Sequence, residues 1–285
     1  MIKVFVDWKE IDSELIHHSD GAINLKIDSD ALLCAKHEVC FYISPVMNVA
    51  VAYMVIDLAS NIFYRYVPYT TKVTLNLPYF PHARADREFQ KGMSIPLKTF
   101  CDKLNSQVWD LVYTKDVHNE AATNQFYNKL KVQSQRNCFD EAIRKNRKLQ
   151  QFLENYNISF CAPDKGASIK VASVANSYTD NIIQLSKCRD VSTGNIQGID
   201  IVSGDVKDKE ILIIDDICDG GMTFISAAKE LKYNGAKSVS LYVTHGIFSK
   251  GLQAFHGMID YIFVNQVVSN YITMDEIDNY NSITY

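Results

Sequence analysis

Residues 210–223 read EILIIDDICDGGMT and place an apolar run, an acidic pair and a glycine loop in direct succession. The four apolar residues at 211–214 are typical of a parallel strand that is covered on both faces. The segment that follows, FISAAKELKYNGA, has the apolar spacing of a helix, and Asn234-Gly235 marks its expected end. The stretch therefore predicts the strand–loop–helix unit of an α/β fold.

The acidic pair and the loop have the donors and acceptors that a phosphorylated sugar requires. Paired carboxylates accept hydrogen bonds from neighbouring sugar hydroxyls, and backbone N–H groups at a helix start attract phosphate. We therefore predict that Asp215 and Asp216 bind a ribose. The predicted phosphate loop consists of Asp219, Gly220, Gly221, Met222 and Thr223. Turn formation and helix capping explain the same segment equally well when it is taken alone.

The chain has 285 residues, and at this length two domains are the natural expectation. Extended apolar segments alternate with helical ones, which favours parallel sheets flanked by helices. A polar, weakly patterned stretch at 114–136 predicts a boundary, with domains at 1–134 and 135–285. Strands are predicted at 2–6, 38–44, 71–77, 109–113, 157–161, 180–185, 210–214, 238–243 and 260–264. Helices are predicted at 47–60, 94–105, 137–155, 166–176 and 223–234.

The composition excludes several classes of protein. A formal net charge of −4 argues against nucleic acid as a partner, because binding to its backbone needs clustered Lys and Arg. No apolar run approaches the roughly 18 residues that span a bilayer, and the first residues lack the pattern of a signal peptide. The seven cysteines form no CxxC pair, which favours reduced thiols. We expect a soluble, cytoplasmic protein without a membrane partner that acts on small molecules.

The N-terminal half contains a second group of candidate residues, in segments that follow predicted strands. Arg84 and Arg87 lie in the segment PYFPHARADRE, and their guanidinium groups can clamp a polyphosphate; a solvated charged loop is the simpler interpretation. Pro96, with Ser94 just before it, marks the start of the next helix. His118 follows another strand, where an imidazole can bind a metal or a phosphate, or can be a surface residue.

Two further segments of the C-terminal half carry charged candidates. Asp164 lies in CAPDKGAS, between a strand and a helix, where its carboxylate can hold Mg²⁺ through water or cap the helix. Lys187 and Arg189 follow a strand and precede a polar loop. A cationic pair on such a mobile loop can close over a transferring phosphoryl group.

Seven segments, taken together and in order, identify a resemblance to the ribose-phosphate diphosphokinases, the phosphoribosyl pyrophosphate (PRPP) synthetases. The resemblance extends from about residue 15 to residue 268. The segments are SDGAINLKI at 19–27, YFPHARADRE at 79–88, DVHNE at 116–120, PDKGA at 163–167, KCR at 187–189, GDVKDKEILIIDDICDGGMT at 204–223 and THGIFS at 244–249.

This resemblance implies two similar type I phosphoribosyltransferase-like domains, each a parallel sheet flanked by helices. It also implies that the anomeric hydroxyl of ribose 5-phosphate attacks the β-phosphorus of MgATP, so that a diphosphoryl group moves and AMP leaves. Catalysis of this kind depends on positioning and charge stabilisation. A homo-oligomer is implied as well, because neighbouring subunits of the family share ATP sites.

The resemblance assigns a role to each candidate by its position. The residues that would contact ATP are Asp20, Arg84, Asp86, Arg87 and His118. Mg²⁺ would be oriented by His118 and Asp164. The catalytic residues would be Lys187, Arg189 and His118, with the two cations stabilising the migrating group. Asp215 and Asp216 would hold the ribose hydroxyls, and residues 219–223 would bind the 5-phosphate.

Departures from the family pattern bear on both substrates. His18 and Ala22 replace an aromatic residue and an acid, which leaves the recognition of adenine open. In the phosphate loop, the family's DTxGT becomes DGGMT, so a hydroxyl is lost at Gly220 and Met222 brings a side chain. A terminal phosphate can be enclosed, whereas a phosphate within a diphosphate ester needs an open exit. The loop therefore slightly favours ADP-ribose as the acceptor, as in phage NAD-reconstitution synthetases. Ordinary PRPP synthesis, with ribose 5-phosphate as the acceptor, is supported almost as well.

Two interpretations from other classes stay open at this point. One is a non-catalytic homologue that regulates a true synthetase; the retained cations and acids argue against it. The other is a phosphoribosyltransferase that consumes PRPP, because the loop at 215–223 is shared in outline. That interpretation leaves the N-terminal half without a role.

Overall fold

The computed structural model describes residues 1–154, 157–189 and 196–282, with the backbone alone for 187–189 and 196–197. The chain divides into two compact units, Met1–Gln133 and Ser134–Tyr285. The boundary predicted from the polar stretch lies one residue further along. Each unit contains a six-stranded, mainly parallel sheet with flanking helices, so the predicted α/β fold class is confirmed.

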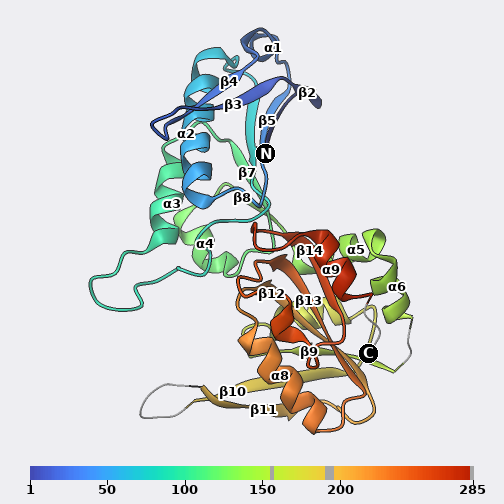
Figure 1. Cartoon of the computed structure of the whole chain (residues 1–285). Helices are drawn as coiled ribbons and strands as arrows, with labels where there is room; N and C mark the ends of the chain where they lie inside the picture. Colours follow the sequence, from blue (N-terminus) through green and yellow to red (C-terminus); the bar gives the residue numbers. More distant parts are fainter. Residues whose placement is uncertain (155–156, 190–195, 283–285) are drawn as a thin grey trace. The chain divides into compact units, whose positions relative to one another are not determined.

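The N-terminal unit is built around one sheet and one separate hairpin (Figure 1). The strand order of the sheet is β2-β1-β5-β6-β7-β8, and the strands from β5 to β8 are parallel. Strands β3 and β4 pair only with each other. The elements are β1 (Ile2–Val6), β2 (Lys9–Ile11), β3 (Ser13–His17), β4 (Ile23–Ile27), α1 (Ser29–Leu33), β5 (Glu38–Ile43), α2 (Val49–Tyr66), β6 (Lys72–Asn76), α3 (Pro96–Asn105), β7 (Leu111–Lys115), α4 (Glu120–Phe126) and β8 (Leu130–Gln133).

Alternating side chains give this sheet a buried face. Val39, Phe41 and Ile43 of β5 are buried and the residues between them are only partly so, which is the period of a strand with one covered face. Helix α2 contributes buried residues to the same apolar core. The ring of Phe41 meets the ring of Phe63 edge-on and stacks on that of Trp109, with centroids 5.9 and 6.2 Å away.

The C-terminal unit has the strand order β11-β10-β9-β12-β13-β14, in which all strands except β11 are parallel to their neighbours. Its elements are α5 (Gln135–Lys145), α6 (Arg147–Leu153), β9 (Ile158–Ala162), α7 (Ser168–Ala175), β10 (Ile182–Arg189), β11 (Ile196–Ser203), β12 (Glu210–Cys218), α8 (Met222–Tyr233), β13 (Ser238–Gly246), the 3-10 turn η1 (Gln253–Phe255), β14 (Ile262–Val267) and α9 (Met274–Tyr280).

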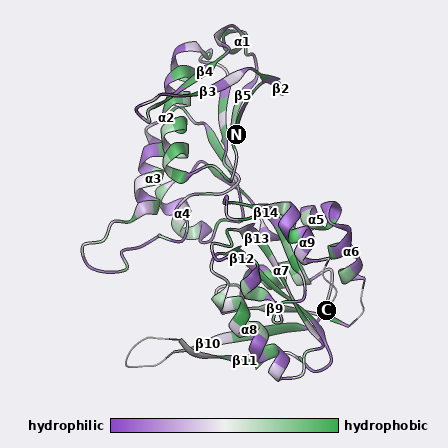
Figure 2. Cartoon of the chain, viewed as in Figure 1, coloured by the Kyte–Doolittle hydropathy of each residue, from purple (hydrophilic) through white to green (hydrophobic). Residues whose placement is uncertain are grey.

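The central strands of this sheet are apolar on both faces, as expected for parallel strands between helices. Ile211, Leu212, Ile213 and Ile214 are all fully buried, and Figure 2 shows β12 mainly in hydrophobic colours. Leu212 and Ile214 pack in one core with residues of α5, α6 and α7. Within the described ranges, no helix is long and apolar enough to cross a bilayer.

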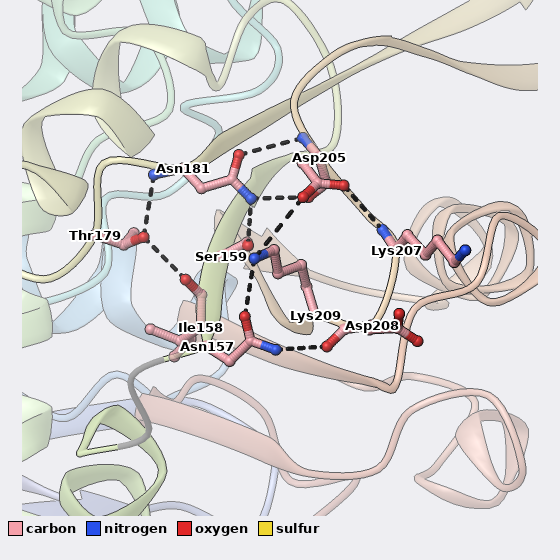
Figure 3. Close-up of polar contacts among 9 residues, drawn as sticks. All are labelled: Asn157, Ile158, Ser159, Thr179, Asn181, Asp205, Lys207, Asp208 and Lys209. Atoms are coloured by element: carbon pink, nitrogen blue, oxygen red, sulfur yellow. Dashed lines mark hydrogen bonds and ion pairs between the residues drawn. The ribbon is translucent and has the colours of Figure 1, made fainter.

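Hydrogen bonds of polar side chains connect the strands of this sheet at their amino ends (Figure 3). Asn181 Nδ2 donates to Ser159 Oγ at 2.5 Å and to the carbonyl oxygen of Asp205 at 2.8 Å. Lys209 Nζ donates to Asn157 Oδ1 at 2.9 Å. Asp205 and Lys209 belong to GDVKDKE, so this part of the motif is structural and lies at the sheet edge opposite the end of β12.

The structure corrects several predicted elements. The helix predicted at 137–155 is interrupted at Asn146, whose side chain caps α6 by accepting from the Leu149 amide at 3.0 Å. The polar stretch at 114–136 contains α4 and β8, and strands β2, β3, β4 and β11 were not predicted. Ser94 does not cap α3, which has Ile95 at its N-cap and Pro96 as its first residue.

Candidate functional site

The acidic pair lies within β12, although the sequence predicted that the strand ends before it. Parallel pairing with β13 continues to Cys218, where Ile217 pairs with His245 and Cys218 with Gly246. Asp216 is 4% exposed, and its amide donates to Asp215 Oδ1 at 2.9 Å. Both carboxylates are therefore held by a regular strand and not by a turn.

Three carboxylates influence one another at this end of the sheet. Burial raises the pKa of Asp215 well above its ordinary value, and the charges of Asp216 and then Asp164 raise it further. Asp164 comes from the turn between β9 and α7, where its Oδ1 accepts from the Gly166 amide at 3.0 Å and the Ala167 amide at 3.2 Å. The structure thus brings Asp164 to the acidic pair and also gives it the turn-stabilising role that was the simpler interpretation.

The predicted phosphate loop connects β12 directly to α8. Gly221 has a φ of +79° at the helix N-cap, a conformation that glycine adopts without strain. A Cβ at this position would lie 2.3 Å from Cζ of Phe255, so the loop depends on close approach to that ring. An α-helix leaves the amides of its first turn without intrahelical acceptors, which is the basis of phosphate binding at such loops. The side chain of Met222 is 61% exposed and does not fill the loop.

A neighbouring turn supports the loop, and residue patterns alone did not single out its members. The amides of Ile247 and Phe248 both donate to the carbonyl oxygen of Cys218, at 2.8 and 3.2 Å. Ser249 Oγ donates to a carboxylate oxygen of Asp219. These residues lie in the segment THGIFS, which the resemblance singled out. Its contact with the loop could not be predicted, because that contact depends on the register between β12 and β13.

The predicted catalytic cations lie on a strand and not on a loop after it. Strand β10 extends through Arg189 because β11 pairs with it in antiparallel orientation: Lys187 lies opposite Ile199 and Arg189 opposite Ile196. Their side chains are outside the described part of the structure. The polar loop predicted to follow them falls largely on residues that are likewise not described.

The candidate residues of the N-terminal unit lie in three segments. Asn119 Nδ2 donates to Asp86 Oδ2 at 2.7 Å, which joins the segment after β6 to the turn after β7. His118, next to Asn119, and Arg84 are exposed. The guanidinium of Arg87 lies 5.4 Å from the centroid of the Phe89 ring.

Asp20 belongs to the turn of the β3–β4 hairpin. It is exposed, and its Oδ1 accepts from the Ala22 amide at 3.0 Å. The hydrogen bond between Asn119 and Asp86 therefore brings two of the three candidate segments together, whereas Asp20 lies in the turn of a separate two-stranded sheet.

The two predicted metal ligands belong to different units. His118 is in the N-terminal unit and Asp164 in the C-terminal unit. Among the described residues, no group of three or more His, Cys, Asp or Glu side chains is arranged to hold a metal ion by itself. The oxygen ligands of Asp164 suit Mg²⁺, which usually keeps several waters and binds substrate phosphates, whereas an imidazole suits it less well.

Comparison with known proteins shows which proteins this chain resembles. The model of the phosphoribosyl synthetase-associated domain matches residues 174–282, which include the acidic pair and the loop. The ribose-phosphate pyrophosphokinase of Mycoplasmopsis pulmonis is 29% identical over 203 residues, covering 70% of this chain and 60% of that enzyme. The enzyme of Mycoplasma genitalium is 28% identical over 261 residues, covering 90% and 75%.

A solved structure agrees with these sequences in its fold. The phosphoribosylpyrophosphate synthetase from Mycobacterium smegmatis matches with a TM-score of 0.75 and 19% identity, covering 95% of this chain and 85% of that one. The family model, the two sequence relatives and this fold all agree. The chain is thus similar in sequence and in fold to the ribose-phosphate pyrophosphokinases, or PRPP synthetases.

Proposed function

We propose that the protein transfers the β,γ-diphosphate of MgATP to the anomeric hydroxyl of a ribose that carries a 5-phosphate, releasing AMP. The observation that carries this proposal is the direct succession of Asp215 and Asp216 on β12, the loop at 219–221 and the start of α8. Similarity to the ribose-phosphate pyrophosphokinases and the cationic strand β10 in the same unit support it.

In this reaction the C-terminal unit binds the acceptor. Asp215 and Asp216 accept hydrogen bonds from the ribose hydroxyls, and the amides at the start of α8 bind the 5-phosphate. The anomeric oxygen then forms a bond to the β-phosphorus of ATP, the bond from that phosphorus to the α-phosphate oxygen breaks, and the hydroxyl proton is released. Lys187 and Arg189 stabilise the negative charge that develops on the migrating group.

ATP is the co-substrate that the N-terminal unit binds in this proposal. Arg84 and Arg87 contact its phosphates, Asp86 and His118 lie in the two segments joined by Asn119, and Asp20 lies near the adenine end. Asp164 would hold Mg²⁺, which would neutralise the negative charge of the ATP phosphates. The resemblance to this family also implies ATP sites shared between subunits, and we therefore propose a homo-oligomer.

We favour ADP-ribose as the acceptor, which gives ADP-ribose pyrophosphate and a role in NAD metabolism, as in the phage enzymes. Gly220 adds no side chain to the rim of the loop, and the exposed side chain of Met222 does not close it. No side chain of the loop itself therefore blocks a phosphate that continues into a diphosphate ester. Ribose 5-phosphate is the second candidate, because the same amides can bind a terminal phosphate.

The test is to mix the protein with MgATP and either sugar, and to measure AMP by chromatography and product mass by mass spectrometry. We expect AMP with ADP-ribose and a product heavier than ADP-ribose by one diphosphate. Lys187→Ala should lower kcat about a hundredfold or more without loss of fold, because its charge acts only in the transition state. AMP with ribose 5-phosphate alone would establish ordinary PRPP synthesis. No AMP with either sugar would favour a non-catalytic, regulatory homologue.

A further inference from the structure

The side chain of Lys250 lies along the rim of the phosphate loop. A Cβ placed on Gly220 would lie 3.5 Å from Cε of Lys250, 3.6 Å from Cδ and 3.9 Å from Cγ. These are van der Waals distances, so the stem of the lysine covers the position where Gly220 lacks a side chain. The residue is exposed, which leaves its ammonium group in contact with solvent at the mouth of the loop.

The backbone that carries Lys250 is tied to the loop. Ile247 and Phe248 donate to the carbonyl oxygen of Cys218, and Ser249 Oγ donates to Asp219. On the far side, the amide of Gly251 donates to the carbonyl oxygen of Phe248 at 2.8 Å and closes the turn. The lysine is thus attached to a turn whose position is set by the strand that ends in the loop.

The charges around the loop explain what a cation adds at this place. Asp216 and Asp164 lie close enough to Asp215 for their charges to raise its pKa, and Asp219 in the loop adds a fourth carboxylate. An anionic acceptor that enters this site experiences repulsion, which a nearby ammonium group offsets. The loop amides bind the first phosphate, and a second phosphate in a diphosphate ester would lie one bridging oxygen further out, toward the rim.

We propose that Lys250 binds this second phosphate and so selects an acceptor whose 5-phosphate is part of a diphosphate. The proposal rests on the proposed function, since it takes the loop as the site of the 5-phosphate. A single ribose phosphate has no group at the rim, so the charge of Lys250 acts more strongly on ADP-ribose than on ribose 5-phosphate.

The test compares Lys250→Met, which keeps the apolar stem and removes the charge, with Lys229→Met, an exposed lysine further along α8. The ratio of kcat/KM for ADP-ribose to that for ribose 5-phosphate should fall about tenfold in Lys250→Met. It should stay at the wild-type value in Lys229→Met and be largely restored in Lys250→Arg. An unchanged ratio in Lys250→Met would overturn the proposal.

Calorimetric titration with ADP-ribose and with ribose 5-phosphate, in the absence of ATP, separates this proposal from the reaction itself. If the wild-type protein forms no AMP with either sugar, the proposed function fails, while a weaker affinity of Lys250→Met for ADP-ribose alone still supports the role of Lys250. An equal loss of affinity for both sugars, or no binding of ADP-ribose to the wild-type protein, would show that the lysine does not recognise a second phosphate.

Discussion

Strands β6 and β12 occupy the same position in their sheets, fourth in each order and between parallel neighbours. The segments that follow them differ. Strand β12 carries the acidic pair and reaches α8 through residues 219–221, whereas β6 is followed by the segment 77–95 before α3 begins. Position in a parallel sheet thus determines where a ligand can lie, and the local sequence determines which ligand it is.

The two helix starts show the same contrast. Neither has a side-chain cap, but α3 begins with Pro96, which has no N–H, whereas α8 begins after Gly221 and retains its amides. Helix α8 can therefore bind a phosphate through its backbone. In the N-terminal unit, the proposed binding of phosphates would depend on side chains such as Arg84 and Arg87. The predictions below test whether the two units differ in this way.

The largest effect is expected at Gly221. In Gly221→Ala, the new Cβ would lie 2.3 Å from the Phe255 ring at a φ of +79°, so the loop must move. We expect a loss of about 2–3 kcal/mol in the free energy of unfolding and a fall of at least about a hundredfold in kcat/KM for the acceptor. Thermal unfolding and AMP formation measure both quantities.

Gly220→Ala is the matched control, because its Cβ meets only the flexible stem of Lys250 at 3.5 Å or more. The free energy of unfolding should change by less than about 0.5 kcal/mol. Equal effects of the two substitutions would show that close packing of the loop on Phe255 is not what the site requires.

A second test assigns one substrate to each unit. Asp216→Asn removes a charged acceptor of the ribose hydroxyls and should raise KM for the acceptor about ten- to a hundredfold, with a smaller effect on KM for ATP. Arg84→Ala should show the opposite pattern, since a guanidinium that contacts ATP phosphates acts on ATP binding. Steady-state kinetics with each substrate varied in turn gives both constants. If both variants weaken the same substrate, the assignment of one substrate to each unit is wrong.

Much of the fold could be predicted because its signal is local. Uninterrupted apolar runs such as 211–214 identify central strands, and the apolar spacing of 223–234 identifies a helix. The prediction ended β12 at Ile214 because two acids follow, but parallel pairing with β13 stabilises the strand through Cys218. The extension of β10 depends in the same way on a partner strand, β11, that residue patterns do not specify.

The site shows the same limit. The acidic pair and the glycine loop are adjacent in sequence, so their chemistry could be predicted together. Phe255, Ser249 and Lys250 contact the loop from a distant segment, and only the register between β12 and β13 brings them there. Residue types alone do not contain that information.

A smaller effect, on stability, is expected at Asp215. Its pKa is raised in the folded protein, so the group favours folding when protonated, and this contribution is lost as the pH rises through the folded pKa. Asp215→Asn should therefore match the wild-type Tm near pH 4 and exceed it by about 2–4 °C near pH 8, while acceptor binding weakens. Asp208→Asn, in an exposed turn, is the control and should change neither. A lower Tm for Asp215→Asn at pH 8 would contradict repulsion among the three carboxylates.

The smallest effects are expected at the amino ends of the strands, where an aspartate in each unit accepts a hydrogen bond from a backbone amide of the neighbouring strand. Asp110 Oδ2 accepts from the Val73 amide at 2.7 Å, and Asp260 Oδ2 accepts from the Val239 amide at 2.7 Å. Asp110→Ala should lower the free energy of unfolding by about 1 kcal/mol. Asp260→Ala should lower it slightly more, because Asp260 also pairs with Lys232.

Neither substitution should change kcat/KM for ATP or the acceptor, since both residues lie at the sheet edge opposite the site. A loss of activity without a loss of stability in either variant would mean that the amino ends of the strands influence the site at their carboxyl ends. The difference between the two units would then not be confined to the segments that follow β6 and β12.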